Sequence, residues 1–418
     1  MEGTYPFTNA DHTRPWLAFV GPQDQRPRDD ETNLMTTKPQ IIIIGAGIGG
    51  LTAAIALRQA GFGIRIFERA AEVKEIGAGL VLSANAVRVL KHLGLMQPVV
   101  DRGTVITAAV TYDSRGNRLG RMPTNLADVP SVCLHRADLQ QALFSALSPD
   151  CVHLGEHLVD FNQTGQGVTA HFASGRTASG DALIGADGLR SRVRAQLLGD
   201  GEPVYRGYQC WRGVCEQRSG EELTETSGLG VRVGLFPIGS RGTAWWCTAN
   251  EDELAKDEPD GAKSKLLRWL ANWHSPIPEV IRGTDPAAII KTGIYDRRPV
   301  KTCGKGCCTL LGDAAHPTTP NMGQGAAMAI EDAILLARCL SSYPDPGAAF
   351  RVYERLRSAR TAKVTNISRY FGVIGQWKNP GATWLRNKLM RLGSGKAAMK
   401  GYLKFVSYDP QTIPLNAG

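Results

Sequence analysis

The sequence predicts an α/β fold in which a helix-covered sheet is interrupted by an inserted β-sheet domain and followed by C-terminal helices. An apolar run at Ile41–Ile44 leads into a glycine-rich turn and then a helical pattern, as expected for a βαβ unit. The stretch 205–246 is rich in short strands and aromatic residues. Long apolar-rich helices are expected at 325–340 and 346–370.

The glycine-rich turn carries Gly45, Gly47, Gly49 and Gly50 directly after the four isoleucines. Gly45 permits a tight turn, Gly47 allows the backbone to approach phosphate oxygens, and Gly50 allows the helix to pack closely on the strand. Free amides at the start of the following helix favour an anion at that position. The turn therefore predicts a Rossmann-type domain that binds the pyrophosphate of a dinucleotide.

A second strand at 64–67 ends at Glu68, close to the spacing of about 20 residues expected for a carboxylate that binds ribose hydroxyls. Arg69 follows directly and is a further candidate cofactor contact. The alternative for 41–57 is a membrane helix whose Gly45 and Gly49 form a dimer motif. The glycines inside the run and its short length favour a strand, a turn and a helix instead.

The composition is that of a soluble globular protein, with 43% hydrophobic and 21% charged residues. Residues 1–37 are polar and lack periodicity, which predicts a flexible extension. Nine scattered cysteines predict reduced thiols and a cytoplasmic location, and their spacing indicates no metal site. The net charge of +9 is dispersed and accompanies no nucleic-acid-binding motif, so a phosphate-bearing cofactor suffices to explain it.

Helices and short strands alternate along the rest of the chain. Helices are expected at 84–93 and 137–147, one helix after an acidic loop within 251–282, and strands at 108–112, 152–154, 168–172, 182–184 and 307–311. The predicted division is an extension at 1–37, nucleotide-binding parts at 38–112, 131–200 and 301–345, an excursion at 113–130, a substrate-binding β-sheet domain at 201–300 and a helical region at 346–418.

Two later segments each join an apolar strand to a polar turn. The first spans 181–194 and contains Asp187-Gly188 before a basic helix start. The second contains Gly312-Asp313 and continues through Pro320 and Gly323-Gln324-Gly325 to Glu331-Asp332. No second glycine fingerprint of the quality of the first occurs, which indicates one tightly bound nucleotide and at most a transient second one.

Together with the glycine turn, these segments resemble the three hallmark motifs of the class A FAD-dependent aromatic monooxygenases, the family that includes para-hydroxybenzoate hydroxylase. The branch most similar to this sequence contains zeaxanthin epoxidase, FAD-dependent urate hydroxylase and salicylate hydroxylase-like enzymes. The resemblance implies that FAD is the cofactor and that NADH or NADPH reduces it transiently. It further implies that molecular oxygen adds at the flavin C4a to give a hydroperoxide, which passes one oxygen atom to an aromatic or other electron-rich small molecule.

The resemblance assigns several cofactor contacts. Asp313 corresponds to an aspartate that accepts from a ribityl hydroxyl. Gly323, Gln324 and Gly325 open the helix that begins at Ala326. Their amides are expected to face the flavin N1 and C2 carbonyl, where negative charge collects on reduction, and Ala326 is a further candidate cofactor contact. Pro320 stiffens the loop that walls the site of oxygen chemistry, and we include it among the candidate catalytic residues.

Arg136 and Asp187 each have a structural alternative. Arg136 matches an arginine near the FAD, and its alternative is an exposed cation at a helix start. Asp187 belongs to a motif that serves both FAD and NAD(P)H, and its alternative is a helix N-cap. Arg190, Arg192 and Arg194 are either hosts for a transient nicotinamide nucleotide or solvated side chains. His316 adjoins the Asp313 motif, and a structural placement is favoured for it.

The segment 205–213 is similar to the family segment that lines the ring-binding cavity. Strand alternation places Tyr208, Cys210 and Arg212 on one face and Gln209 and Trp211 on the other. Arg206, Tyr208 and Arg212 are the candidate substrate contacts. No histidine or carboxylate of this region is singled out as a general base, which leaves hydroxylation of an electron-rich ring and epoxidation both open.

Three alternatives accompany the expected aromatic hydroxylase. They are an epoxidase of an isoprenoid or heteroaromatic substrate, a flavin halogenase, and a flavoprotein without turnover that senses redox state. The WxWxIP signature of halogenases is missing, since Trp245-Trp246-Cys247 does not match it. The basic stretch 378–404, which contains Trp384, Leu385, Leu389 and Met390, allows contact with a membrane, although a terminal helix that covers the core is favoured. A monomer or a homodimer is expected.

Overall fold

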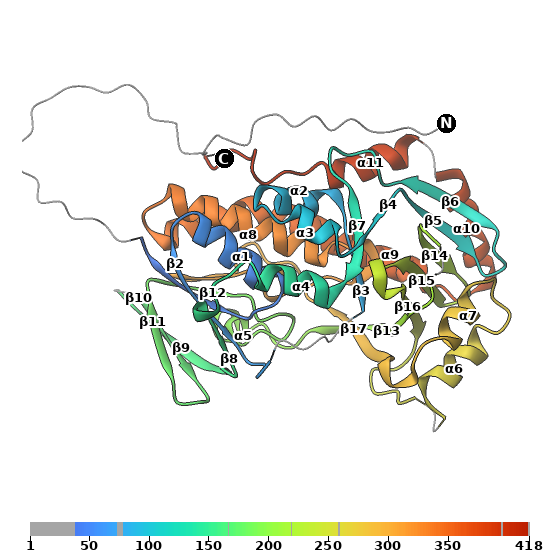
Figure 1. The fold of residues 1–418 in the computed structure, drawn as a ribbon, viewed down its shortest axis with the longest axis horizontal. Helices are drawn as coiled ribbons and strands as arrows, with labels where there is room; N and C mark the ends of the chain where they lie inside the picture. The colour runs from blue at the N-terminus through green and yellow to red at the C-terminus, as the bar shows by residue number, and fades with distance from the viewer. Residues whose placement is uncertain are drawn as a thin grey trace, which may run out of the picture. The chain divides into compact units, whose positions relative to one another are not determined.

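The computed structural model describes residues 38–416 except 73–77, 166, 219, 258–259 and 394–395. The predicted extension at 1–37 lies outside the described residues. Residues from Lys38 onward form one compact unit. Within it, a parallel sheet and its helices lie beside a larger, mostly antiparallel sheet (Figure 1).

The parallel sheet is assembled from three separated pieces of the chain. Its five strands have the order β18-β12-β1-β2-β8, and each neighbouring pair is parallel. Their bounds are β1 Gln40–Ile44, β2 Gly63–Glu68, β8 Val152–Leu154, β12 Ala182–Gly185 and β18 Cys308–Leu310. The prediction of a Rossmann-type domain is therefore confirmed.

Strand β1 lies between two hydrophobic cores, which explains its uninterrupted isoleucines. Ile41 and Ile43 belong to one buried cluster, whereas Ile42 and Ile44 belong to the other. Alternate side chains of a strand point to opposite faces of the sheet, so a strand covered on both faces is apolar throughout.

Different elements cover the two faces. The first core includes the helices α1 (Ile48–Gln59) and α8 (Gly325–Ser342), which pack against each other. The second core includes the antiparallel sheet of β9 (Leu158–Thr164), β10 (Gly167–Phe172) and β11 (Thr177–Gly180), drawn below the parallel sheet in Figure 1.

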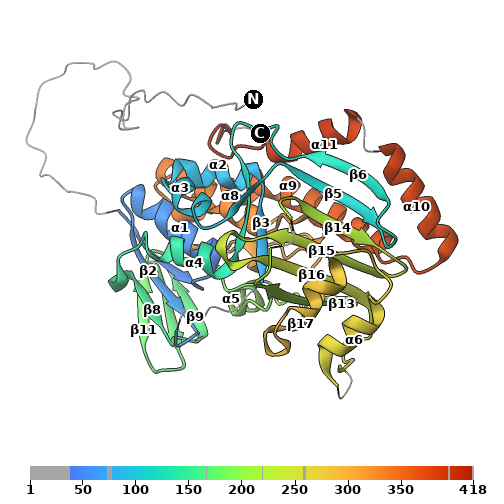
Figure 2. The same ribbon diagram turned by 45° about the vertical axis from the view of Figure 1, so that its right-hand side comes forward.

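The second large sheet has seven strands in the order β17-β13-β16-β15-β14-β5-β6. Their bounds are β5 Ala108–Asp113, β6 Arg118–Pro123, β13 Val204–Cys215, β14 Leu223–Ser227, β15 Val231–Pro237, β16 Thr243–Asn250 and β17 Ile290–Asp296. The excursion toward this sheet begins earlier than 113, because β5 is already paired in parallel with β14. Figure 2 shows β5 and β6 at one end of the sheet.

Two helices cover the outer face of the seven-stranded sheet. These are α6 (Gly261–Trp269) and α7 (Ile277–Arg282), which pack on Trp211 and Trp245. The expectation of one helix within 251–282 was wrong, because residues 270–276 turn the chain between two short helices.

The remaining elements connect and enclose the two sheets. A small sheet contains β3 (Gly79–Leu82), β4 (Thr104–Ile106) and β7 (Ser131–His135), and the other helices are α2 Ala84–His92, α3 Met96–Val100, α4 Arg136–Phe144, α5 Arg192–Leu198, α9 Pro346–Gly375, α10 Pro380–Gly393 and α11 Lys396–Val406. Every helix in the described parts of the chain falls short of the length and apolarity needed to span a bilayer. All nine cysteines are free thiols.

Candidate active site

Three glycines of the turn after β1 are required by close packing. Gly45 has a φ of +107°, and a Cβ there would lie 2.5 Å from the carbonyl oxygen of Ala186. A Cβ on Gly50 would lie 2.0 Å from the carbonyl oxygen of Gly45, and one on Gly49 would lie 2.6 Å from Leu311 Cδ2. The turn thus fits against the residues that follow β12 and β18 only because these side chains are absent.

Gly47 differs from the other glycines of the turn, because a Cβ there would meet no protein atom within 4 Å. The space in front of it is open, as a close approach of phosphate oxygens requires. Glu68, at the end of β2, accepts hydrogen bonds from the amides of Ala46 (2.8 Å) and Ala70 (3.0 Å). Its carboxylate therefore braces the turn and keeps lone pairs for a ribose hydroxyl. Arg69 is exposed next to it.

The side chain of Asp187 is occupied by helix α5. Its Oδ2 accepts from the amides of Arg192 (2.7 Å) and Val193 (3.2 Å), and its Oδ1 accepts from the Ser191 hydroxyl. Burial raises the pKa of the Asp187 carboxyl. These contacts favour the capping role over direct contact with a cofactor.

Arg194 is not a solvated side chain. It is fully buried, and its guanidinium donates to the carbonyls of Ala314 (2.9 Å) and Ala315 (2.6 Å) and pairs with Asp200. It therefore fixes the loop that follows Asp313 and is excluded as a host for a transient nicotinamide. The expectation of a solvated arginine was wrong because the sequence does not show which carbonyls the helix start meets.

Asp313 lies on a 3₁₀ turn, Gly312–Ala314, directly after β18. Its side chain is accessible from a cavity, and no described residue donates a hydrogen bond to its carboxylate. The surrounding protein raises the pKa of its carboxyl by desolvation, while the charges of His316 and Arg136 oppose that shift. An acceptor without a protein donor suits a hydroxyl-bearing ligand. Arg136 is exposed at the start of α4, as its structural alternative expected.

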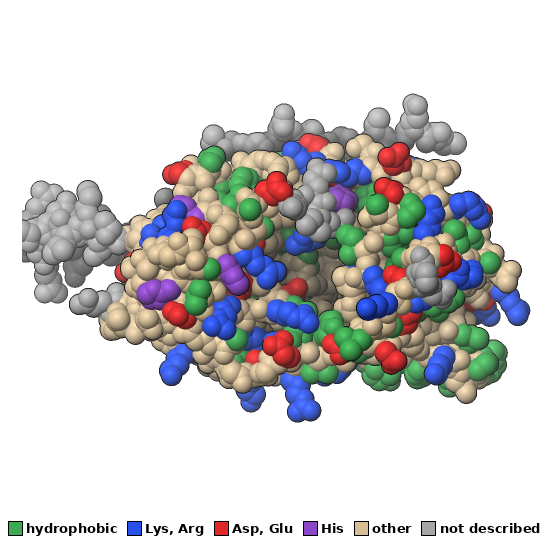
Figure 3. Space-filling model, turned by 90° about the horizontal axis from the view of Figure 1, so that it is seen from below, with side chains coloured by type: hydrophobic (Ala, Val, Ile, Leu, Met, Phe, Trp, Pro, Cys, Tyr) green, Lys and Arg blue, Asp and Glu red, His purple; other side chains and the backbone are tan. Residues whose placement is uncertain are grey.

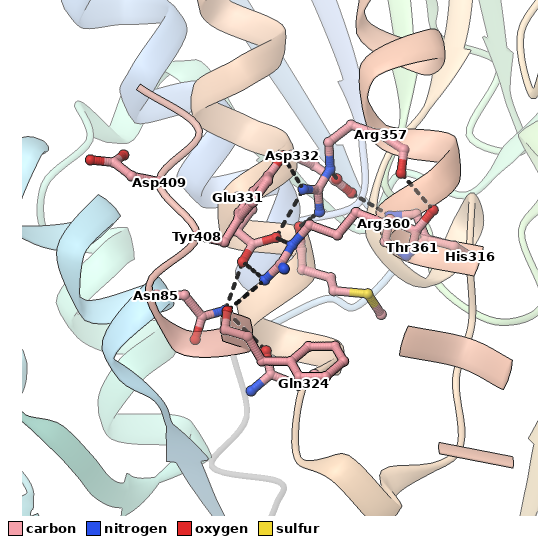
Figure 4. A network of polar contacts seen from close by, with 12 residues as sticks. Asn85, His316, Gln324, Glu331, Asp332, Arg357, Arg360, Thr361, Tyr408 and Asp409 are labelled. Atoms are coloured by element: carbon pink, nitrogen blue, oxygen red, sulfur yellow. Dashed lines mark hydrogen bonds and ion pairs between the residues drawn. The ribbon is translucent and has the colours of Figure 1, made fainter. Parts of the chain in front are cut away.

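A buried polar network holds the Asp313 turn in place (Figure 4). Asp332, on α8, accepts from the Gly312 amide (2.9 Å), from His316 Nε2 (2.6 Å) and from Arg357 Nε (2.6 Å). Burial alone would raise the pKa of Asp332, but His316 and Arg357 hold it far below its ordinary value. The favoured structural placement of His316 agrees with these contacts.

The neighbouring Glu331 extends the network across three helices. Its carboxylate accepts from Asn85 Nδ2 (2.6 Å) on α2, and from Arg357 Nη1 (2.9 Å) and Arg360 Nε (2.8 Å) on α9. Desolvation would lower the pKa of Arg357, but the two carboxylates raise it well above its ordinary value. Asn85 also donates to the Gln324 side chain (2.9 Å), which is thereby turned toward α2. Figure 4 shows this connection at the start of α8.

The start of α8 faces the cavity through backbone rather than side chains. Gly323 has a φ of +60°, and a Cβ there would meet no atom within 4 Å. Gly323, Gly325 and Ala326 line the cavity, as does Pro320 on the preceding turn. The positive end of the helix therefore lies where a ligand with negative charge would be stabilised.

The cavity has a volume of about 530 Å³ and lies between the Asp313 loop and the seven-stranded sheet. In Figure 3 the surface is hollowed near its middle, between the part that carries the parallel sheet and the part that carries the larger one. The large apolar side chains that line the cavity include Ile106 of the small sheet, Tyr402 of α11 and, from the seven-stranded sheet, Val110, Met122, Leu223, Phe236 and Trp246. Its size and lining are typical of a small-molecule site.

The three candidate substrate contacts have different positions. Arg212 lines the cavity and donates to Thr292 Oγ1 (2.6 Å). The Tyr208 hydroxyl, whose pKa is raised by burial, accepts from Asn321 Nδ2 (2.9 Å), and Tyr208 itself does not line the cavity. Arg206 also lies outside the lining and forms an ion pair with the buried Asp296.

The predicted alternation along β13 is confirmed. Cys210 and Arg212 line the cavity, whereas Trp211 belongs to the core under α6 and α7. Arg206 lies before the irregular pairing of β13 and β17, so its ion pair rather than strand alternation determines its position.

Sequence analysis missed a charged cluster on the cavity wall. Arg232, on β15, is almost fully buried, pairs with Glu225 (Nη1 to Oε1, 3.2 Å), contacts Asn321 and lies 5.5 Å from the centre of the Trp246 ring. All four of these residues line the cavity. The available signal was one arginine between Val231 and Val233 in an otherwise apolar strand.

Comparisons with known proteins agree with this geometry. The model of the family described as FAD binding domain matches residues 38–368. The aurachin C monooxygenase/isomerase of Stigmatella aurantiaca is 42% identical over 86% of this chain and 96% of that protein. The FAD-dependent urate hydroxylase of Klebsiella pneumoniae is 33% identical over 76% of this chain and 86% of that protein. The crystal structure of Klebsiella pneumoniae HpxO complexed with FAD and uric acid has a TM-score of 0.84 at 29% identity and covers 91% of this chain and 100% of that chain.

The described residues fit FAD at three points. The space at Gly47 is open for a pyrophosphate, the carboxylate of Asp313 is an acceptor without a protein donor, and the start of α8 lines the same cavity. The family match covers all three. The chain therefore belongs to the FAD-binding family of class A flavoprotein monooxygenases and is an FAD-dependent enzyme.

Proposed function

We propose that this monooxygenase inserts one atom of molecular oxygen into an electron-rich aromatic or heteroaromatic compound that carries an apolar substituent. NADH or NADPH serves as the transient reductant. The observation that carries the proposal is the cavity of about 530 Å³, whose walls are largely apolar and whose charged side chains are few.

The distribution of polar groups supports an aromatic ring with one polar edge. Arg212, Glu225 and Arg232 are contributed by the seven-stranded sheet, and the Arg232–Glu225 pair lies beside Trp246. A ring hydroxyl or ring N–H could donate to Glu225, while a negatively charged edge could accept from an arginine. The apolar side chains Met122, Leu223 and Phe236 offer room for a hydrocarbon substituent.

The protein contributes binding, orientation and exclusion of water. FAD, when bound, supplies the transfer of electrons from NAD(P)H and the activation of oxygen. Gly47 leaves space for its pyrophosphate, Asp313 accepts from a ribityl hydroxyl, and the amides at the start of α8 favour negative charge. Pro320 and the apolar lining keep water away from the reacting atoms.

Glu225 is a candidate to accept a proton from the substrate. It and Asp313 are the carboxylates among the described residues that line the cavity. Asp313 is assigned to the ribityl chain, which leaves Glu225 for the substrate. Its pairing with Arg232 would orient its carboxylate.

Epoxidation of an olefinic substituent is the second candidate, and the apolar lining favours it over oxidation of a small acidic ring. Relatives named for their substrates include the aurachin C enzyme and a 6-hydroxynicotinate 3-monooxygenase. Aurachin C is accordingly the first compound to test, because its enzyme is 42% identical to this chain. We further propose a cytoplasmic monomer or homodimer, which the nine free thiols support as far as location is concerned.

The test measures oxidation of NADH and NADPH by the FAD-loaded protein with aurachin C, 3-amino-4-hydroxybenzoate, urate and 6-hydroxynicotinate. We expect aurachin C to accelerate the oxidation of NADH or NADPH and to gain one ¹⁸O atom from ¹⁸O₂. Mild acid separates the products, since an epoxide adds water and a ring hydroxyl does not. If every compound leaves the rate unchanged, or if all oxygen ends as hydrogen peroxide, the proposed substrate class is wrong.

A further inference from the structure

Helix α10 (Pro380–Gly393) turns its apolar side chains outward. Trp384 is 63% exposed, Leu385 45%, Leu389 57% and Leu392 74%. At about 3.6 residues per turn, these four positions share an arc of about 140°. A surface helix of a globular protein has the opposite arrangement, with its apolar stripe toward the core. We call these four side chains the α10 apolar face.

Polar contacts on the other side of the helix fix this orientation. Arg386 is almost fully buried and donates to the carbonyls of Gly375 (3.0 Å) and Gly228 (3.1 Å). Thr383 is also buried and donates to the carbonyl of Trp377 (3.2 Å). Burial lowers the pKa of Arg386, yet its two carbonyl partners retain the guanidinium in place. The helix is therefore held with its apolar face outward by specific hydrogen bonds.

The face lies beside an outer element of the substrate cavity. Helix α10 packs on β6, whose Met122 lines the cavity, and the next helix, α11, contributes Tyr402 to the same lining. Figure 2 shows α10 and α11 along one edge of the molecule next to β6. An apolar surface bound by this face would be close to the substrate site.

The stretch of sequence that includes α10 and α11 carries charge of one sign, although Asp113 of β5 pairs with Arg391 of α10 (Nη2 to Oδ2, 3.6 Å). No acidic residue occurs between Glu354 and Asp409, whereas lysines and arginines recur throughout. Lys388 lies within the apolar arc, 5.1 Å from the centre of the Trp384 ring, and Lys378, Lys400 and Lys404 are exposed. Basic residues close to an anionic bilayer are attracted to its surface.

We infer that the α10 apolar face docks this enzyme on the surface of an anionic phospholipid bilayer. The combination of an outward tryptophan and leucines with neighbouring lysines is the pattern of a helix that lies in the plane of a membrane interface. The described helices are too short or too polar to span a bilayer, so the attachment is peripheral. The inference does not depend on the identity of the substrate.

The test uses the full FAD-loaded chain and flotation with two kinds of vesicle, phosphatidylcholine alone and phosphatidylcholine mixed with phosphatidylglycerol. We expect binding to the mixed vesicles that weakens as salt is raised. The double variant Trp384→Ser/Leu389→Ser removes two exposed anchors and should lower the partition coefficient roughly tenfold or more. Because both side chains are more than half exposed, the FAD content and thermal unfolding should stay unchanged.

Leu254→Ser is the matched control, because Leu254 is 89% exposed but lies outside α10. It should bind vesicles as the unmodified protein does. The inference is overturned if the unmodified protein does not float, if the double variant floats equally well, or if neutral vesicles bind as strongly as anionic ones. It is also overturned if ultracentrifugation shows a dimer that the double variant dissociates, because the face would then be an interface between two copies.

Discussion

Substituting two glycines of the same turn should separate cofactor binding from folding. Gly47 has extended backbone (φ −73°, ψ −179°), and a Cβ there meets no protein atom within 4 Å. Gly47→Ala should therefore leave the FAD-free protein intact, or stabilise it by about 0.4–1 kcal/mol through the unfolded state. The new methyl group occupies the space in front of the turn, so the affinity for FAD should fall roughly tenfold to hundredfold.

Gly45→Ala is the opposite case. Its φ of +107° and the 2.5 Å approach to Ala186 strain the folded protein itself, at a cost of about 1–3 kcal/mol. Urea unfolding of the FAD-free proteins measures stability, and quenching of flavin fluorescence measures affinity. If Gly47→Ala binds FAD as tightly as the unmodified protein, or unfolds at lower urea without FAD, the assignment of this space to the pyrophosphate is refuted.

Three further predictions concern the carboxylates. Asp332→Asn should lower the free energy of unfolding by about 3–5 kcal/mol at neutral pH, because Arg357 keeps only one buried carboxylate. Since the pKa of Asp332 is depressed in the folded protein, its stabilising contribution is present above the unfolded pKa of about 3.9 and is lost as the pH falls below it. Unfolding curves of the two proteins should therefore converge in acid. Asp313→Ala should weaken FAD binding roughly tenfold or more. It should not destabilise the FAD-free protein, because no described residue donates a hydrogen bond to this carboxylate. A wild-type FAD affinity would contradict this role. If Glu225 accepts the substrate proton, Glu225→Gln should lower kcat and leave the FAD content unchanged. Rapid-reaction kinetics with a compound that the enzyme oxidises would measure this effect. An unchanged pH profile of kcat would argue against proton transfer to Glu225.

The parallel sheet and its glycine turn were predictable because their sequence signals are local. The run Ile41–Ile44 and the glycines that follow it are adjacent in the chain. The apolar run indicates a strand that is buried on both faces, and the glycines indicate the turn after it. The turn at Asp313 was found by resemblance, and its geometry agrees with an acceptor that faces the cavity. In these segments, neighbouring residues determine most of the local structure.

The charged residues of the site were poorly predicted because their partners are distant in sequence. Arg357 and Arg360 lie on a long helix whose pattern allows them to be solvated, but both pair with the buried carboxylates of Glu331 and Asp332. Arg206 appeared to be a substrate contact from its neighbours, but Asp296 on another strand binds it.

Helix α10 illustrates the same limit. Its composition suits a helix that covers the core, and the sequence alone favoured that arrangement. The carbonyls of Gly228 and Gly375 instead bind Arg386 and turn the leucines outward. Which face of a helix is buried depends here on two acceptors that no periodicity identifies.

The division of the FAD site among separated pieces of chain has a consequence for biosynthesis. A ribosome that has completed Gly45 and Glu68 has made only the first part of the site, because β18 and Asp313 are still to be translated. The buried polar network that holds the Asp313 turn also needs Arg357, which is translated later still. Contacts of such long range form slowly, so flavin should be acquired late, when synthesis is nearly finished. Nascent chains halted before α9 should consequently lack bound flavin.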